Sequence, residues 1–500
     1  MHPIARLRFV KAFLPLLLIL ALVLSTTLAA FAVTLVQISS DPFTNRTSQH
    51  KTQVEPDTFS FGNTIVSTFQ SGRFFDGGSS DIGWATSTDG GTTWTHGFLP
   101  GITKYFGNGR FDRVSDPAVA YDAKHNVWLI SSLALLNVPS GVLGAAVLTS
   151  RSTDGGLTWS QPFPVTVARD GQDLDKNWIV CDNSPLSPFY GNCYTTFDDF
   201  GHRNLALNST STDGGMTWST PITTADSFSV IGGQPLVQPN GNVIVPIDDA
   251  FELEVRSYMS TDGGASWSKT VRVAFIQSHT EGGGLRSGPL PSAEIDSAGK
   301  VYVVWADCRF RAGCSANDIV MSTTLDGTNW SPVTRVPIDS LTSGADHFIP
   351  GLAVDRTTAL SSAHLGLAFY EYPKSSCTLL TCRLIAGFIS STDGGATWAS
   401  RTQLTTPVQL PWLANTTQGR MVGDYISTSF VGGMAFPVFA DARPPASGIC
   451  DVGHLDCQEA MFTVQGGLMQ AAGEATMSAA NDRPVAVAPS PAVKVRQTHR

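Results

Sequence analysis

Ser87-Thr88-Asp89-Gly90-Gly91-Thr92-Thr93-Trp94 is a stretch that recurs along the chain and decides its fold. An aspartate can accept hydrogen bonds from nearby backbone N–H groups and close a tight turn, and a glycine pair permits positive φ. The tryptophan can then pack between neighbouring sheets. Four further full copies and one copy shorter by a residue centre on Asp154, Asp213, Asp262, Asp393 and, for the short copy, Asp326. The repeat, called the Asp box below, therefore predicts structural turns rather than catalytic aspartates.

The spacing of these turns predicts the fold class. Successive aspartates lie 65, 59, 49, 64 and 67 residues apart, which suits a four-stranded unit with variable loops. In the second unit, strands are expected at 116–122, 127–133 and 145–150, and Trp159 opens a fourth, so the box joins the third strand to the fourth. The chain is thus predicted to be all-β, a β-propeller of four-stranded antiparallel blades.

The innermost strands predict the number of blades. They are expected to begin near Glu55, Asp116, Asp175, Gly233, Pro289, His347 and Gly423, which favours seven blades. The last blade lacks a box and has three strands, at 421–430, 434–440 and 459–464, so a strand at 34–39 is expected to supply the fourth. A ring closed by the N-terminal strand leaves no free sheet edge. Six blades remain an alternative if one end blade is misassigned.

Both ends of the chain differ from the predicted propeller in composition. Arg6, Arg8 and Lys11 precede an apolar run at 13–24 and a small-residue site at 30–32, which is the pattern of a signal peptide. An uncleaved anchor is the alternative, but a spanning helix needs about 20 apolar residues. We therefore expect a signal peptide at 1–32, a propeller at 33–465, a disordered Ala/Pro-rich tail at 466–500, and a secreted, extracellular protein with no membrane span in the mature chain.

Charge and cysteine content narrow the function classes. The net charge is −9, and loss of the three basic residues of the signal peptide would bring it to −12 (−9 − 3), which argues against nucleic acid as a partner. No C-x₂-C spacing or histidine cluster suggests zinc. The eight cysteines instead predict four local disulfides in an exported protein. The expected pairs are Cys181/Cys193, Cys308/Cys314, Cys377/Cys382 and Cys450/Cys457.

Strand direction predicts which face carries function. If each inner strand runs from top to bottom, the third strand also ends at the bottom, so the Asp boxes lie on the bottom face. Three of the cysteine pairs fall in loops of the top face, and Cys181/Cys193 falls near the bottom. Carboxylates and arginines gather at the starts of inner strands and the ends of second strands, which suits carbohydrate chemistry at the top.

The Asp boxes resemble those of the sialidases and the wider BNR-repeat propellers, over residues 53 to 400. The resemblance implies a secreted, exo-α-sialidase-like glycoside hydrolase. In that family an arginine ends an early second strand and an acid/base aspartate follows in the next loop. The matching positions here are Arg73 and Asp76, with Asp81 as the second choice for the acid/base.

The same resemblance implies a nucleophile and a substrate clamp. Tyr425 would attack the anomeric carbon while Glu294 takes its proton, and Asp76 would protonate the leaving oxygen. This chemistry requires Tyr425 and Glu294 within hydrogen-bond reach. Arginines would hold a sialate carboxylate. The expected substrate contacts are Arg73, Arg309, Arg420, Asp116, Asp424 and His347.

Two other functions fit the same sequence. One is a non-catalytic propeller that binds glycans or a cell-surface protein. The other is a different hydrolase or lyase that uses a carboxyl pair such as Asp116 with Asp424. The expected partner is a glycan or glycoconjugate, and the protein is expected to be a monomer without a cofactor. A structural Ca²⁺ ion among the top-face carboxylates is possible, but no spacing marks a ligand set.

Overall fold

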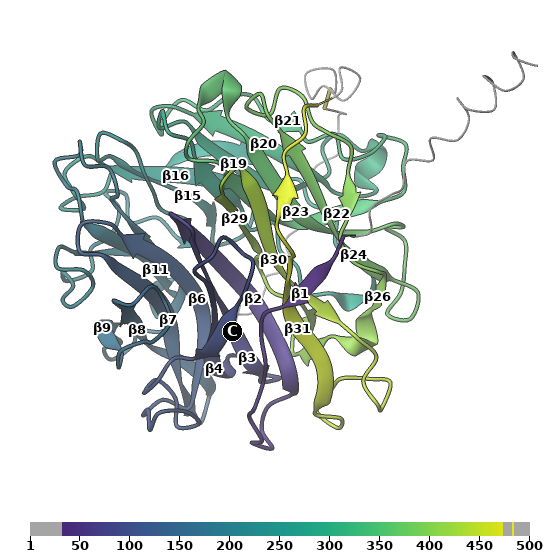
Figure 1. Ribbon diagram of the computed structural model, residues 1–500, viewed down its shortest axis with the longest axis horizontal. Coiled ribbons are helices and arrows are strands. Elements are labelled where there is room, and N and C mark those ends of the chain that lie inside the picture. The colour runs from purple at the N-terminus through teal and green to yellow at the C-terminus, as the bar shows by residue number, and fades with distance from the viewer. Residues whose placement is uncertain (1–32, 474–482, 485–500) are drawn as a thin grey trace, which may run out of the picture. The chain divides into compact units, whose positions relative to one another are not determined.

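The computed structural model describes residues 33–473 and 483–484, in which nearly all regular structure is β-strand (Figure 1). The described residues from Leu35 onward form one compact unit. Helical structure in the described residues consists of five short 3₁₀ turns, η1 (Phe200–His202), η2 (Gly282–Gly284), η3 (Ala312–Cys314), η4 (Leu360–Ser362) and η5 (Leu410–Trp412). The all-β prediction is therefore confirmed. In this part of the chain, no helix is long and apolar enough to cross a membrane.

The described strands pair into six sheets: groups 1, 2 and 7 below are parts of one 13-stranded sheet, groups 3 to 6 are a sheet each, and a two-stranded hairpin is the sixth. Group 1 is β2 (His50–Phe61), β3 (Thr64–Arg73), β4 (Ser79–Ser87) and β5 (Thr95–Phe98). Group 2 is β6 (Arg113–Asp122), β7 (Val127–Val138), β8 (Gly141–Ser152) and β9 (Phe163–Val167). Group 3 is β10 (Leu174–Cys181), β11 (Cys193–Asp199) and β12 (Leu205–Ser211). Group 4 is β13 (Val230–Ile231), β14 (Leu236–Val237), β15 (Val243–Asp249), β16 (Glu254–Ser260) and β17 (Val271–Phe275). Group 5 is β18 (Ser292–Ile295), β19 (Val301–Asp307), β20 (Asp318–Thr324) and β21 (Thr334–Arg335).

The last two groups lie on either side of a separate hairpin. Group 6 is β22 (Asp346–Val354), β23 (Leu365–Tyr372), β24 (Arg383–Ser391), β25 (Thr402–Gln403) and β26 (Val408–Gln409). The hairpin is β27 (Ala414–Thr416) and β28 (Gly419–Met421). Group 7 is β29 (Ser427–Val431), β30 (Met434–Ala442), β31 (Asp456–Val464) and β32 (Leu468–Met469), together with β1 (Leu35–Gln37).

The first described strand completes the last group. β1 pairs antiparallel with β31, with Leu35 opposite Val464, and the two strands lie side by side in Figure 1. The predicted strand at 34–39 therefore joins group 7 as expected. β32 pairs with β30, so the prediction of a disordered tail from residue 466 is wrong for Leu468–Met469. The predicted signal peptide at 1–32 and most of the predicted tail, 474–482 and 485–500, lie outside the described residues.

Each Asp box forms the turn that its sequence predicts. Asp89 accepts hydrogen bonds from the backbone N–H groups of Thr92 (3.1 Å) and Thr93 (2.9 Å), and from the Thr93 hydroxyl (2.7 Å). These bonds, above all the one from the Thr93 side chain, lower the pKa of Asp89 to about 2. Corresponding contacts recur at Asp154, Asp213, Asp262, Asp393 and the short copy at Asp326. The box aspartates are therefore committed to the turns.

The second glycine of a box packs on the preceding strand group. A Cβ atom at Gly156 would lie 2.8 Å from a Val66 methyl carbon of group 1. In the first box, Gly91 faces the ring of Phe436 in group 7, so the same contact links the first group to the last. Only a residue without a side chain fits this close approach.

All four predicted disulfides are present. The bonded pairs are Cys181–Cys193, Cys308–Cys314, Cys377–Cys382 and Cys450–Cys457, and no cysteine is left free. Each bond closes a short loop, between 5 and 12 residues in sequence separation. Four disulfides fit a protein of an oxidising compartment.

Gly156→Ala should destabilise the fold more than Gly155→Ala. The two glycines have matched positive φ values, +85° and +83°, so the backbone strain is the same in both variants. A methyl group at 156 would meet Val66 at 2.8 Å, whereas one at 155 would meet only Thr88, at 3.9 Å. We expect a lower Tm for Gly156→Ala in thermal unfolding, from an overpacking cost of about 1–3 kcal/mol. Equal Tm losses would contradict the packing of the box on the preceding group.

Candidate functional site

Three neighbouring inner strands carry the same irregularity, in the middle of β2 and near the N-terminal ends of β6 and β10. The register of β2, β6 and β10 against the next strand breaks once, as in a β-bulge. A residue in each break has a left-handed backbone, with φ of +55° at Glu55, +47° at Asp116 and +49° at Lys176. This conformation costs a non-glycine residue about 1–2 kcal/mol. Because residues of this kind cluster at functional sites, the three bulges mark a candidate site.

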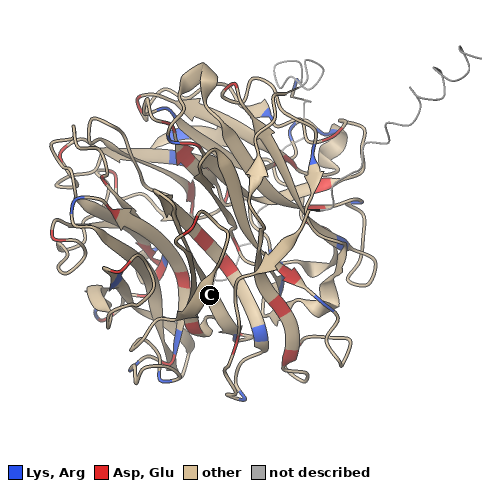
Figure 2. Ribbon diagram, viewed as in Figure 1, with Lys and Arg blue, Asp and Glu red and all other residues tan. Residues whose placement is uncertain are grey.

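The three bulge side chains meet two further charged residues in the interior. Lys176 Nζ lies 2.6 Å from an Asp424 oxygen, and 3.8 Å and 3.9 Å from oxygens of Glu55 and Asp116. Arg286 donates from Nε (2.7 Å) and Nη2 (2.5 Å) to the two oxygens of Asp424. We call these five residues the buried charge cluster, and each is at most 4% exposed. Figure 2 shows that acidic residues lie within the strands themselves as well as on the loops.

Burial and neighbouring charges set the protonation of the cluster. Burial raises the pKa of Glu55 to about 7, although the charge of Lys176 opposes the rise. Burial alone would lower the pKa of Lys176, but the carboxylates of Asp424, Asp116 and Glu55 outweigh it, and the pKa lies above its usual range. At neutral pH a protonated carboxyl group can therefore lie beside a carboxylate that is held by two cations.

Uncharged side chains orient the carboxylates of the cluster. The Gln70 amide donates to Glu55 and, at 3.0 Å, to the Ser115 hydroxyl, which donates to Asp116 at 3.1 Å. Arg73 donates to Gln70 Oε1 at 3.1 Å. Burial, and then repulsion from Arg286, lowers the pKa of Arg73 to about 10. Arg73 therefore supports the cluster through Gln70.

The β27–β28 hairpin is bonded to both sides of the site. The Thr417 N–H donates to the Phe75 carbonyl at 2.9 Å, and the Arg286 N–H donates to the Arg420 carbonyl at 2.6 Å. Because Arg286 also holds Asp424, the hairpin is tied directly to the cluster. With every cluster side chain at most 4% exposed, a substrate can reach the carboxylates only if covering chain moves.

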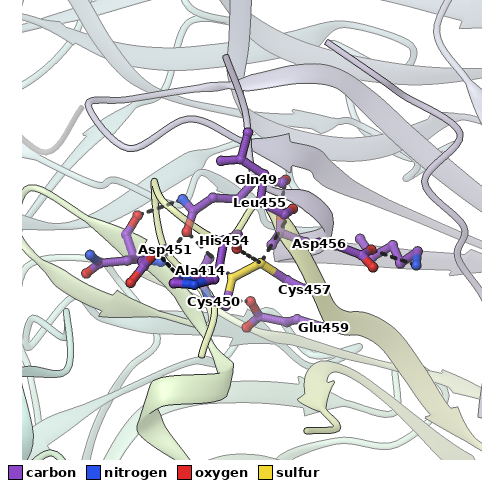
Figure 3. The surroundings of a disulfide bond; sticks show 12 residues. Gln49, Ala414, Cys450, Asp451, His454, Leu455, Asp456, Cys457 and Glu459 are labelled. Carbon is purple, nitrogen blue, oxygen red and sulfur yellow. Dashed lines mark hydrogen bonds and ion pairs between the residues drawn. A yellow bond between two sulfur atoms is a disulfide. The ribbon is translucent and has the colours of Figure 1, made fainter. Parts of the chain in front are cut away.

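The Cys450–Cys457 disulfide loop anchors this hairpin (Figure 3). Glu459 accepts the Ala414 N–H at 2.8 Å, next to the disulfide. The Arg420 guanidinium donates to the carbonyl oxygens of Leu413 (2.9 Å) and Cys450. The Arg420 side chain is thus hydrogen-bonded to backbone carbonyl groups of the fold. This position does not support its predicted role in a carboxylate clamp.

The predicted acid/base residues lie in different surroundings. The Asp76 side chain is 52% exposed and pairs with Arg113 at 2.5 Å. Partial burial raises the pKa of Asp76, but the hydrogen bond and charge of Arg113 outweigh it, so the pKa lies below its usual range. A lowered pKa is unfavourable for a proton donor. Asp81 is fully buried, and burial raises its pKa well above the usual range.

The predicted nucleophile pair is not formed among the described residues. The Tyr425 hydroxyl donates to the Pro117 carbonyl at 3.3 Å, and its ring packs edge-on against Trp178 with centroids 5.0 Å apart. Glu294 instead accepts from Arg356 at 3.2 Å and lines a separate cavity. Burial raises the pKa of the Tyr425 hydroxyl well above its usual range, so the phenolate is disfavoured. The predicted pairing of Tyr425 with Glu294 is therefore corrected.

Two other predicted substrate contacts have partners away from the cluster. Arg309 donates from Nε (2.8 Å) and Nη2 (2.7 Å) to the carboxylate of Asp307. His347 is fully buried, with Nδ1 3.3 Å from the Asn317 carbonyl, and burial lowers its pKa. Of the predicted contacts, Asp116 and Asp424 are the two that share Lys176. The expected clamp of Arg73, Arg309 and Arg420 is not assembled by these contacts.

No functional role was predicted from the sequence for Glu55, Lys176 or Arg286. A local signal does exist for Glu55, because it precedes a proline inside a predicted strand, as Asp116 does. Proline restricts the residue before it and removes a ladder hydrogen bond, so the pair marks an interrupted strand. Lys176 precedes an asparagine and carries no such mark.

One acidic group has spacing that a metal ion could use. Ligand atoms of Asp318, Asp339 and His347 lie within 4.8 Å of one another. However, Arg311 bonds to Asp318 at 2.6 Å, and Arg335 bonds to Asp339 at 2.5 Å. A cation there would lie beside two guanidinium groups, so this donor set fits an ion-pair network better than Ca²⁺. The predicted structural Ca²⁺ stays a prediction without a ligand set.

Several known proteins resemble this chain, each over a short segment or at low sequence identity. No protein-family model matches the chain. A sialidase from Bacteroides fragilis (strain YCH46) is 33% identical over 119 residues, which span 21% of each chain. Among solved structures, a polysaccharide lyase of the PL25 ulvan lyase family bound to -[GlcA(1-4)Rha3S]- is 11% identical, covers 90% of this chain and 100% of its own, and has a TM-score of 0.49. The Hadza microbial sialidase Hz136 is 14% identical, covers 85% and 66%, and has a TM-score of 0.40.

Glu55→Gln should remove a pH dependence from the stability of the fold. The folded pKa of about 7 lies above the ordinary value of 4.5, so the folded state binds the extra proton between these pH values. The stabilisation is present below the ordinary pKa and is lost as pH rises through the folded pKa. Wild type should therefore lose about 1–3 kcal/mol relative to the variant between about pH 5 and pH 8. Chemical unfolding at several pH values measures this slope, and a constant difference between the proteins would contradict it.

Proposed function

We propose that the seven strand groups are the blades of a seven-bladed β-propeller completed by β1. The inner strands contact one another in the order β2, β6, β10, β14, β18, β22 and β29, and β29 contacts β2. The packing of Gly91 on Phe436 links the first group to the last in the same sense. A closed ring explains why group 7 takes its outer strand from the other end of the chain, because β1 then completes the last blade and joins the two ends of the ring.

We further propose that the protein is a secreted glycoside hydrolase that acts on an extracellular glycan or glycoconjugate through carboxyl groups rather than a tyrosine. The observation that carries this proposal is the geometry of the buried charge cluster, where Glu55 and Asp116 both approach Lys176. Glycosidases commonly need one protonated and one ionised carboxyl group on either side of the scissile bond. Glu55, with a pKa raised to about 7 by burial, carries a proton in about half of the molecules at neutral pH and can act as the proton donor.

In the proposed reaction the two carboxyl groups have separate roles. The Glu55 proton goes to the glycosidic oxygen as its bond to the anomeric carbon breaks. Asp116, oriented by Ser115 and by the Lys176 backbone N–H (3.2 Å), takes a proton from the water that attacks that carbon. Asp424 stays bonded to Arg286 and Lys176 and offsets one of their two positive charges. Because each cluster side chain is at most 4% exposed, part of the chain that covers the cluster must move to admit the sugar.

A non-catalytic glycan-binding or surface-binding propeller is the second candidate. The observation in its favour is that the cluster is almost inaccessible and that its charges already have partners, as in a structural ion-pair network. On this alternative the cluster holds the inner strands together and performs no chemistry. The two candidates differ in whether any glycan is cleaved.

Glu55→Gln and Asp116→Asn should each lower glycan cleavage by at least about 100-fold, because each removes a group that transfers a proton. The measurement is release of a fluorophore from a panel of sialyl and neutral glycosides, with Tm checked for each variant. Asp76→Asn and Tyr425→Phe form the matched pair, and cleavage should persist in both.

The panel separates three outcomes. The proposal would be overturned if Asp76→Asn and Tyr425→Phe lost cleavage while Glu55→Gln retained it. That result would restore a tyrosine mechanism. Absence of cleavage of every substrate by wild type, together with retained binding of one of them, would favour the binding module.

A further inference from the structure

A cavity of about 970 Å³ lies at the C-terminal ends of the inner strands. Its lining includes the ends of β2, β10, β22 and β29, whereas Glu55, Asp116 and Lys176 lie nearer the N-terminal ends of their strands. The cavity is therefore at the opposite end of these strands from the buried charge cluster. Its volume is within the usual range for a small-molecule site, roughly 300–1,000 Å³.

One wall of the cavity holds a cation between a carboxylate and an aromatic ring. The Arg356 guanidinium donates to Glu294 at 3.2 Å and lies 4.5 Å from the centroid of the Phe59 ring. The side chains of Arg356 and Glu294 are 40% and 23% exposed, so a ligand can reach both. Burial raises the pKa of Glu294, and Arg356 opposes the rise. An acidic group beside an aromatic face is a common way to bind a positive charge.

The rest of the lining favours a ligand that donates hydrogen bonds. Among the described lining residues, Arg356 is the only lysine or arginine, against the four acids Asp182, Glu294, Asp296 and Asp355. The amide oxygen of Gln470 is buried there and accepts no hydrogen bond within the described part of the chain. Phe61 and Met469, 44% and 77% exposed, add apolar surface. Asp182, Asp296 and Asp355 already accept hydrogen bonds from nearby residues, so what they add to the cavity is negative charge, which opposes an anionic ligand.

We propose that this cavity binds a ligand with a protonated amino group on a partly apolar body, of which an amino-sugar oligosaccharide is an example. The ammonium group would bond to Glu294 and lie against Phe59, in the place that the Arg356 guanidinium now holds. The remaining donors of the ligand would meet Gln470 and the strand ends. The sugar body of the ligand rests on the proposed glycan function, whereas the charge of the ligand rests on the cavity alone.

Substitution of the two charged residues should change affinity in opposite directions. Glu294→Gln removes the carboxylate that holds the ammonium group, and we expect roughly tenfold weaker binding. Arg356→Gln removes the competing cation and frees both Glu294 and Phe59, so binding should become tighter. Calorimetry with a glucosamine oligosaccharide at about pH 6 measures both effects, and the N-acetylated oligosaccharide of equal length, which lacks the charge, should bind more weakly.

Controls separate this proposal from the proposed function. Glu55→Gln, in the buried charge cluster, should bind the amino sugar as wild type does, so a failure of glycan cleavage leaves the binding result intact. Thermal unfolding of each variant establishes that the fold is retained. Weaker binding in Arg356→Gln with tighter binding in Glu294→Gln would identify an anionic ligand and overturn the proposal. Equal binding of the charged and N-acetylated oligosaccharides, or no binding of either to wild type, would also overturn it.

Discussion

The Lys176 ammonium group lies among the carboxyl groups of Glu55 on β2, Asp116 on β6 and Asp424 in the segment between β28 and β29, and the local arrangement of these elements depends on it. Asp424 is 2.6 Å away, and Glu55 and Asp116 are just under 4 Å away. A buried cation without these partners would be costly, and so would the carboxylates without the cation. The attraction between opposite charges in the cluster thus offsets the conformational cost of the left-handed backbone at Glu55, Asp116 and Lys176. Removing the Lys176 charge would leave the buried Asp424 carboxylate with Arg286 as its remaining cationic partner and would take the cation away from Asp116.

The features that the sequence could predict are local in the chain. An Asp box closes through contacts between residues three and four apart, as from Asp89 to Thr93, and each cysteine pair is at most 12 residues apart. The pairing of β1 with β31 is not local, but it follows from the missing fourth strand of the last group. These predictions therefore needed no knowledge of how one strand group packs on the next.

The site depends instead on how far along its strand each residue lies and on where the β-bulges occur. A register break changes which side chains face the interior, and alternation in the sequence does not reveal it. The family resemblance implies that Tyr425 and Glu294 form a pair, but they have separate partners, Pro117 and Arg356. The inner strands consequently carry a closed charge cluster near one end and an open cavity at the other.

The protonation of Glu55 is the quantity on which the proposed acid chemistry depends most directly. It can be followed by ¹³C NMR titration of protein labelled at the glutamate carboxyl carbon, with the signal assigned by its absence in Glu55→Gln. The structure predicts a midpoint of about 7, because burial outweighs the attraction of Lys176. A midpoint close to the ordinary value of 4.5 would mean that Glu55 is ionised at neutral pH and cannot act as the proton donor.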